Sequence, residues 1–461
     1  MNNMDFTTGN EGRSILRFSI PIISGAFLMQ LYNWADTVIV GRYVGKQALA
    51  AVGASAPFVF MLVALVMGIG IGTTIIISQA YGLRDYDKIR KASDSLYLFL
   101  TAAAVAITAL GLIFSRKIMI LIDLPEDILP YAVSYLNIYL LGLIFLFFFN
   151  CLSSILRGIG DSRTPLIFLA VSAVLNILLD LLLVAVIPLG IEGAAWATVI
   201  AQAMAVTFAI LYTNRRNDIV RFDPRRLVFD RRIFVRSLKL GIPAGVQQMF
   251  VAMGMLAIVS IVNSFDTDTV AAFSGASRIE TLVSVIPMNL GIALTSFTGQ
   301  NFGVGDFDRI RRGMYATVRY SLIAGAVVMI GLLLAAEPLM RVFTTEREVI
   351  EVGCGYLRVL GLSFWIFSLM MCFMGALRGM GNTVAPMIIT LFSLWIVKIP
   401  VAYMLSERFG QTGIWAASAF SWSLGTICAA VAFNMTSRRR RIERDISDKK
   451  DIITERYDNT L

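Results

Sequence analysis

The sequence predicts an all-α polytopic membrane protein with about 12 transmembrane helices in two parallel six-helix lobes. Hydrophobic residues make up 57% of the 461 residues, and charged residues make up 15%, whereas soluble proteins carry about 25% charged residues. Apolar runs of about 20 residues, the length that crosses a hydrocarbon core, recur along the whole chain. Segments of the first half also return in the second half.

This internal repeat has one consistent offset. Four pairs of segments share it: 156–165 (LRGIGDSRTP) with 377–386 (LRGMGNTVAP), 79–90 with 300–311, Pro21 with Pro243, and Gly190 with Gly410. The offset is 221 residues for the two longer segments and differs by one residue for the others. Each repeat holds an even number of spans, which returns the chain to the same side of the membrane. The lobes should therefore be related by a pseudo-twofold axis along the membrane normal.

The repeat and the basic segments divide the chain. We expect four parts: a first lobe over 1–214, a basic cytoplasmic linker over 215–239, a second lobe over 240–435 and a basic cytoplasmic tail over 436–461. Lys and Arg collect in the linker, in the tail and in loops on the same side, which is typical of the cytoplasmic face. Contact with anionic lipid heads explains the net charge of +9, so no nucleic acid partner is expected.

The same pattern predicts where the chain resides. Both termini should be cytoplasmic in a multi-pass protein of the plasma (inner) membrane. Residues 1–13 lack the regions of a cleaved signal peptide, so the first apolar run should remain as a span.

Residue types exclude several enzyme chemistries. The chain has no histidine, which removes His-based zinc sites and the Ser-His-Asp triad. No GxxxxGK[ST] phosphate loop is present. Its four cysteines lie within or at the ends of apolar runs, without paired spacing. We therefore expect a protein that is not an enzyme, needs no cofactor and is energised by an ion gradient.

Three carboxylates lie inside predicted spans, namely Asp36, Asp180 and Glu280. A charged side chain at mid-membrane costs at least ~3 kcal/mol on insertion scales, and such residues are usually functional. Asn176 and Asp180 are four residues apart, so they share one helix face. The corresponding positions of the second lobe are apolar near Asp36, Asn176 and Asp180, which restricts this acidic pair to the first lobe.

Two ion chemistries suit these residues. Carboxylate, amide and hydroxyl oxygens are the ligands that a small hard cation prefers. Alternatively, a carboxyl group removed from water and placed beside another carboxylate can carry a proton. A structural role as hydrogen-bonded packing groups is a third interpretation. Glu280 has two interpretations: it attracts a cationic substrate, or it pairs with Lys398 or Arg278.

Taken together, several motifs resemble the multidrug and toxic compound extrusion (MATE) family. They are Pro21, 31–45 (LYNWADTVIVGRYVG), 156–165, 175–180 (LNILLD), 190–198 (GIEGAAWAT) and 298–306 (TGQNFGVGD). Within the family, the chain is similar to the branch named for the DNA-damage-inducible protein F. The resemblance implies twelve helices in two V-shaped lobes, and antiport in which H⁺ or Na⁺ enters while a cationic amphipathic compound leaves.

Carried over by position, the resemblance also implies site residues. The cation- or proton-binding site would comprise Asp36, Asn176, Asp180 and Thr198, with Na⁺ as one candidate ion. Tyr32, Tyr135 and Asn150 would support it. From the residues themselves, we expect Glu280 to line the substrate cavity or to be a structural carboxylate, and Pro21 to be a hinge near which span 1 bends or repacks when the acids are neutralised. The family's other ion pattern, a Glu in span 7 with an Asp in span 10, is missing: span 7 has Gln247 and Gln248 instead.

A flippase for lipid-linked oligosaccharides, from the same superfamily, is the alternative function. Such a protein needs basic cavity residues for a pyrophosphate. Only Lys398, Arg278, Arg319 and Arg358 lie within predicted spans, whereas the clear pair is acidic. We therefore expect small organic cations as substrates, and a monomer surrounded by membrane lipids.

Overall fold

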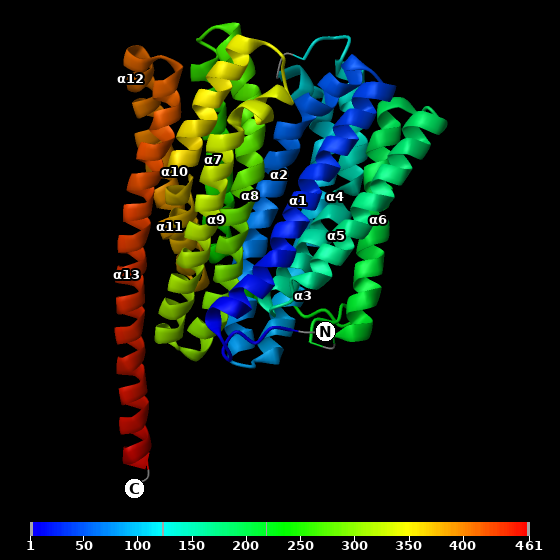
Figure 1. Cartoon of the computed structure of the whole chain (residues 1–461). Helices are drawn as coiled ribbons and strands as arrows, with labels where there is room; N and C mark the ends of the chain where they lie inside the picture. Colours follow the sequence, from blue (N-terminus) through cyan, green and yellow to red (C-terminus); the bar gives the residue numbers. More distant parts are fainter. Residues whose placement is uncertain (1–2, 122–123, 218, 459–461) are drawn as a thin grey trace. The chain divides into compact units, whose positions relative to one another are not determined.

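The computed structural model describes residues 3–121, 124–217 and 219–458, and these residues form helices joined by short connections (Figure 1). The first half contains α1 (Glu11–Tyr43), α2 (Lys46–Gly82), α3 (Tyr86–Leu121), α4 (Leu129–Gly158), α5 (Arg163–Asp180) with the π-helical segment η1 (Leu181–Val186), and α6 (Gly190–Arg216). The second half contains α7 (Arg231–Val262), α8 (Thr267–Val304), α9 (Phe307–Arg341), α10 (Arg347–Gly379), α11 (Val384–Leu391) with the π-helical segment η2 (Phe392–Lys398) and α12 (Ile399–Phe409), and α13 (Gln411–Asp458).

In the described part of the chain, 12 helices are long and apolar enough to cross a membrane. The predicted all-α fold with about 12 spans is therefore confirmed. Residues 384–409 count as one span, because η2 joins α11 to α12 without a break. The last three residues of the expected tail lie outside the described residues.

The contacts divide the chain into two compact units. Unit 1 comprises Met1–Met4 and Phe18–Met249, and unit 2 comprises Asp5–Arg17 and Phe250–Leu461. Their boundaries fall inside α1 and α7, whereas the sequence predicts boundaries at the basic linker. Helix α7 begins at Arg231, within the range predicted for the linker.

Glycines explain why the first part of α7 belongs to unit 1. Gly68 and Gly72 on α2 face Gly241 and Gly245 on α7. A Cβ atom on Gly68 would lie 2.3 Å from the Gly245 nitrogen, and one on Gly241 would lie 2.6 Å from the Ile69 Cα. Small residues four apart let two membrane helices approach closely. The two GxxxG motifs therefore hold α7 against α2.

The segment before α1 packs on unit 2 in a similar way. Phe6 is fully buried, and its N–H donates to Gln300 Oε1 at 2.8 Å. Arg309 Nε donates to the Phe6 carbonyl at 2.8 Å, and Arg309 Nη2 donates to the Thr8 carbonyl at 2.6 Å. Hydrogen bonds from a guanidinium are among the stronger ones. These hydrogen bonds explain why residues 5–17, which include the first residues of α1, belong to unit 2.

Equivalent contacts confirm the repeat at the atomic level. Thr74 Oγ1 on α2 donates to the Ser154 carbonyl on α4 at 2.9 Å. Thr295 Oγ1 on α8 donates to the Gly375 carbonyl on α10 at 3.0 Å, and each of these residues lies 221 positions after its counterpart. The second and fourth helices of each half are therefore joined by the same hydrogen bond.

At the turns after α4 and α10, the two glycines of each pair have different backbone conformations. Gly160 and Gly381 have φ values of 84° and 80°, a left-handed conformation that favours glycine. Gly158 and Gly379 are helical instead, and a Cβ on Gly379 would lie 2.5 Å from the Thr298 Cβ. Only the second glycine of each pair therefore makes the turn.

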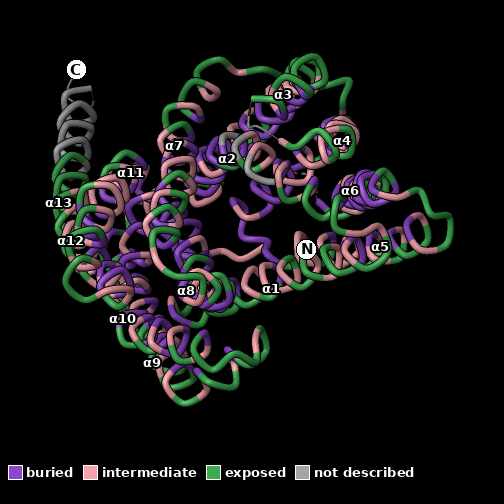
Figure 2. The backbone as a smooth tube through the Cα atoms, turned by 90° about the horizontal axis from the view of Figure 1, so that it is seen from above, coloured by how far each residue is buried: buried purple, intermediate pink, exposed green. Residues whose placement is uncertain are grey.

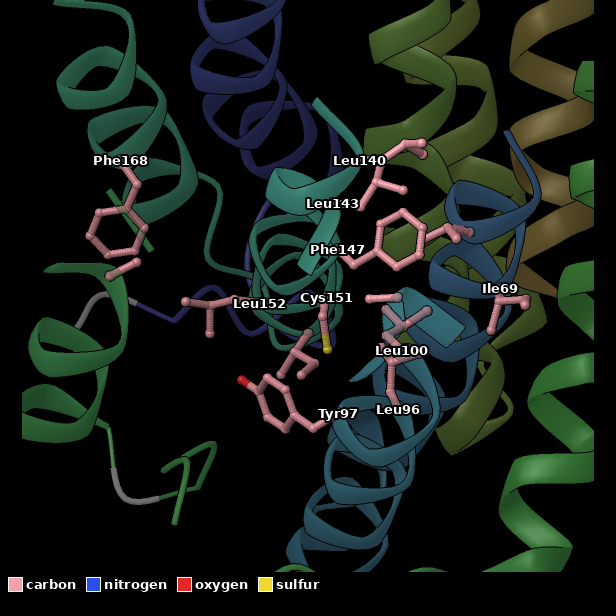
Figure 3. Close-up of a cluster of buried hydrophobic side chains, with 14 of the residues drawn as sticks. Ile69, Leu96, Tyr97, Leu100, Leu140, Leu143, Phe147, Cys151, Leu152 and Phe168 are labelled. Atoms are coloured by element: carbon pink, nitrogen blue, oxygen red, sulfur yellow. The ribbon is translucent and has the colours of Figure 1, made fainter. Parts of the chain in front are cut away.

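Burial follows the pattern expected in lipid. The core of unit 1 lies between α2, α3 and α4 and includes Tyr97, Leu140 and Phe147 (Figure 3). Helices α2, α4, α8 and α10 are the most buried, and α9 is the least buried (Figure 2). Leu334 on α9 is 81% exposed. An outer surface of this kind suits the apolar interior of a bilayer.

We predict that Gly68→Ala destabilises the protein by about 1–3 kcal/mol, because the new methyl group has no space against α7. Gly53→Ala is the matched control, since Gly53 lies on the same helix and a Cβ atom added to it would have no neighbouring atom within 4 Å. It should be neutral or stabilising by up to about 1 kcal/mol. Thermal unfolding of both purified variants checks this. Equal effects would mean that the α2–α7 contact is not tightly packed.

Candidate functional site

A cluster of polar side chains lies inside unit 1. Tyr32 and Asp36 are one turn apart on α1, and Asn176 and Asp180 are one turn apart on α5. Thr198 reaches the cluster from α6. Asn176 is 1% exposed and Asp180 is 0% exposed. The structure thus brings together the four residues predicted to bind a cation or proton.

Asn176 connects α5 to α6. In the amide orientation that pairs donors with acceptors, Asn176 Nδ2 donates to Asp180 Oδ2 at 2.7 Å. Asn176 Oδ1 then accepts from Thr198 Oγ1 at 3.2 Å. This arrangement fixes one oxygen of Asp180. Its other oxygen, Oδ1, is buried and accepts no hydrogen bond from the described residues.

The carboxyl groups of Asp36 and Asp180 lie within hydrogen-bonding distance of each other. We call these two residues the acid pair. Two carboxylates repel each other in an apolar setting, and a hydrogen bond between them requires a proton. No Lys or Arg side chain of the described residues forms an ion pair with either acid. The acid pair therefore needs a proton or another small cation for its neutralisation.

Three tyrosines surround Asp36. The Tyr32 hydroxyl lies near Thr198 and is close enough to both acids to interact electrostatically. Tyr135 and Tyr139 on α4 stack with ring centroids 6.2 Å apart, and both lie near Asp36. Phenol groups can donate hydrogen bonds to a carboxylate or offer oxygens to a cation. They give the acid pair a polar lining in an otherwise apolar unit.

A small cavity of about 50 Å³ adjoins the cluster. Tyr32, Asn176, Thr198, Gln202 and Phe149 are among the residues that line it. Such a volume admits a few water molecules or a partly hydrated ion, whereas sites for drug-sized compounds are about 300–1,000 Å³. The cavity therefore suits an ion rather than an organic substrate.

The backbone changes its helical form directly after Asp180. Helix α5 ends at this residue, and the π-helical segment η1 begins at Leu181. The wider π turn is rare, and where it occurs it often marks a functional position. It shifts the register of the residues that follow, so Asp180 lies where the helix can alter its packing.

Three other predicted residues, Asn150, Glu280 and Pro21, form no hydrogen bond or ion pair with the acid pair in the described part of the chain. Asn150 follows Phe149, a residue that lines the small cavity, and it donates to the Leu146 carbonyl of its own helix at 2.9 Å. Glu280 belongs to unit 2. Helix α1 continues through Pro21, which is fifteen residues before Asp36, so the expected hinge is about four turns from the acids.

Two residues near the site were not among the sequence candidates. Tyr139 follows Tyr135 by four residues, and Gln202 follows Thr198 by four residues. Side chains four apart on a helix point the same way. Both residues could therefore have been identified from the sequence, because each lies one helical turn after a predicted site residue.

Comparisons with known sequences identify the family to which this architecture corresponds. The family described as MatE matches residues 21–182 and again residues 243–404, one match in each half of the chain. The chain is 30% identical over 433 residues to a protein named probable multidrug resistance protein YpnP from Bacillus subtilis, covering 94% of this chain and 97% of the relative. It is 25% identical to a protein named FAD transporter from Shewanella oneidensis, covering 87% of this chain and 90% of the relative.

Solved structures show the same fold. A structure described as the outward-facing conformation of a multidrug resistance MATE family transporter superposes with a TM-score of 0.89 at 24% identity. The match covers 96% of this chain and 99% of that one. This likeness confirms two lobes of transmembrane helices.

We predict that Thr198→Val lowers the free energy of unfolding by about 1–3 kcal/mol, because the buried Asn176 oxygen loses the hydrogen bond from the Thr198 hydroxyl. Thr207→Val is the matched control: Thr207 is exposed on the same helix, and its hydroxyl donates only to the Ala203 carbonyl at 2.8 Å. Its stability should change by less than about 0.5 kcal/mol. Chemical unfolding in detergent measures both. If the two variants behave alike, Asn176 does not depend on Thr198.

Proposed function

The chain belongs to the MatE family of multidrug and toxic compound extrusion transporters, and from this premise we propose that it exports cationic amphipathic compounds in exchange for H⁺ or Na⁺. The family is one of transporters and not of enzymes, and the 12 spans make the chain a multi-pass membrane protein. The basic linker and tail support a plasma-membrane location with both termini in the cytoplasm.

The observation that carries this proposal is the acid pair. The fully buried carboxyl group of Asp180 faces the half-buried carboxyl group of Asp36. One oxygen of Asp180 has no hydrogen bond from the described residues, and none of their basic side chains forms an ion pair with either acid. Burying such a charge without a partner is costly. A proton or sodium ion that enters from water removes this cost, and its departure restores it.

Exchange follows from electrostatics. When the acid pair is charged, it attracts a cationic substrate into its lobe. When a coupling ion neutralises the pair, that attraction disappears and the substrate is released. Ion and substrate therefore compete for one negative charge, which is the requirement for antiport.

Both coupling ions suit the residues present. The Asp180 and Asp36 oxygens, the Asn176 amide oxygen and the Thr198 hydroxyl would provide an oxygen-only set for Na⁺. The closeness of the two carboxyl groups equally supports a shared proton. The choice of ion is therefore a matter for measurement.

We predict that ethidium efflux from vesicles follows a proton gradient or a sodium gradient, and that Asp36→Asn and Asp180→Asn each reduce the driven rate by at least about tenfold. Each substitution removes the charge for which ion and substrate compete, and typical coupling free energies are about 1–3 kcal/mol. Each gradient is imposed separately on the same vesicles.

Glu126→Gln is the control for this experiment, because Glu126 is exposed and lies between α3 and α4. It should transport like the natural protein. FAD, an anion with a pyrophosphate group, serves as a substrate of opposite charge. Gradient-driven FAD movement with no ethidium movement would overturn the proposal, as would full efflux by well-folded Asp180→Asn.

A second prediction concerns binding at equilibrium. The coupling ion should weaken ethidium binding about 5–150-fold, and ethidium should weaken ion binding by the same factor, since linkage is reciprocal. Fluorescence titration of the purified protein at two ion concentrations measures the first factor. In Asp36→Asn the factor should fall close to one. An unchanged factor would place the coupling ion elsewhere.

A further inference from the structure

A cavity of about 680 Å³ lies within unit 2, where α9 and α10 pack side by side (Figure 2). Three arginines, Arg341, Arg347 and Arg358, line it together with two glutamates, Glu337 and Glu351. Sites for small ligands commonly have volumes of about 300–1,000 Å³. The cavity is separate from the acid pair, which belongs to unit 1.

The charges of the cavity do not cancel. Arg341 Nη2 lies 2.5 Å from Glu337 Oε1, and Arg347 Nε lies 3.0 Å from Glu351 Oε1. Each of these ion pairs joins residues four apart on one helix, so each neutralises itself. Arg358 forms no ion pair with any residue that the structure describes. The cavity therefore retains one positive charge, which a singly charged anion would neutralise.

The depth of the cavity follows from the distribution of charge along the two helices. Residues 320–336 of α9 and 359–377 of α10 contain no Asp, Glu, Lys or Arg. These stretches are about 26–29 Å long, which is close to the thickness of about 30 Å of a hydrocarbon core. Glu337 and Arg358 are the first charged residues beyond them. The cavity therefore begins where the hydrocarbon core ends and the phosphate groups of lipids lie.

Arg358 is placed to present its guanidinium at this boundary. It is exposed on α10, and side chains on a helix lean toward the helix N-terminus, which is here the end that lines the cavity. An arginine at such a position lays its aliphatic part along apolar surface and keeps its charge in the polar region. Leu334 and Leu362 are exposed about one turn from Glu337 and Arg358. They provide apolar surface directly beside the cavity.

We propose that this cavity binds the headgroup of an anionic phospholipid, and that Arg358 is the main contact to its phosphate. A guanidinium can donate two parallel hydrogen bonds to phosphate oxygens. The phosphodiester of phosphatidylglycerol carries one negative charge, which matches the one positive charge that the cavity retains. A soluble phosphate ester shares this chemistry, but it has no acyl chains to contact Leu334 and Leu362.

The position of the basic tail indicates which leaflet supplies the lipid. Arg441 of α13 Nη1 lies 3.3 Å from Oδ1 of Asp308, in the first turn of α9. The cavity is at the other end of α9, so it lies opposite to the tail within unit 2. With the tail in the cytoplasm, as proposed above, the lipid comes from the outer leaflet. The leaflet rests on that proposed orientation, whereas the site itself does not.

The test titrates the purified full chain in detergent with three probes. Dioleoyl phosphatidylglycerol carries the anionic headgroup, dioleoyl phosphatidylcholine has the same acyl chains but no net charge, and glycerophosphoglycerol is the anionic headgroup without acyl chains. Native mass spectrometry counts the bound molecules and gives the Kd of the tightest site. Arg358→Met removes the charge that the cavity retains. Arg319→Met is the matched control, because Arg319 is exposed at the other end of the charge-free stretch of α9 and does not line the cavity.

We expect one phosphatidylglycerol to bind at least about tenfold more tightly than either other probe. Arg358→Met should weaken this binding by at least about tenfold, because the charge-assisted hydrogen bonds to the phosphate are lost, and Arg319→Met should change it by less than about twofold. The inference is overturned if either other probe binds as tightly as phosphatidylglycerol, or if Arg358→Met and Arg319→Met have equal effects.

A gain of affinity decides the matter where Arg358→Met does not fold. Glu337→Gln releases Arg341 from its ion pair and gives the cavity a second positive charge. We expect it to tighten phosphatidylglycerol binding about three- to fivefold. Glu407→Gln, which removes an exposed carboxylate of α12 outside the cavity, should leave binding unchanged. No gain in well-folded Glu337→Gln, or the same gain in both variants, refutes the site. These measurements involve no transport, so the proposed function stands or falls separately.

Discussion

The placement of two carboxyl groups against each other in an apolar interior is the constraint on which the rest of unit 1 depends. Asp36 and Asp180 cannot both be charged there without a compensating cation. Asn176 fixes one oxygen of Asp180 and leaves the other available, and the tyrosines of α1 and α4 supply hydroxyl groups around Asp36. These neighbours offer hydrogen-bonding groups to the two acids but do not neutralise their charge. The site therefore needs a mobile ion for its neutralisation.

The repeat preserves contacts between helices but does not preserve the ionisable residues. The hydrogen bonds from Thr74 and Thr295 recur in both halves, because the second and fourth helices of each half need the same close contact. The ionisable residues do not recur, since Asp36 and Asp180 correspond to apolar positions. A duplicated helical frame can therefore hold different charges in its two copies.

Much of this was predictable from the sequence, for identifiable physical reasons. Apolar run length predicts spans, and the cost of a buried charge singles out Asp36 and Asp180. The contacts of the segment before α1 were not predictable, because Phe6 reaches Gln300 through a fold in which residues nearly 300 positions apart become neighbours. Asn150, which the resemblance places near the site, stays a prediction; its amide donates to the Leu146 carbonyl of its own helix.

The residues at the start of each half make such long-range contacts. Phe6, ahead of α1, donates to Gln300 in unit 2, and Arg236 of α7 donates to Gln79 in unit 1 at 3.1 Å. The two glutamines are 221 residues apart and hence equivalent. Each half therefore begins on the other unit and enters its own through one continuous helix. Helix α1, which carries Asp36, therefore has its first residues in unit 2 and the remainder in unit 1.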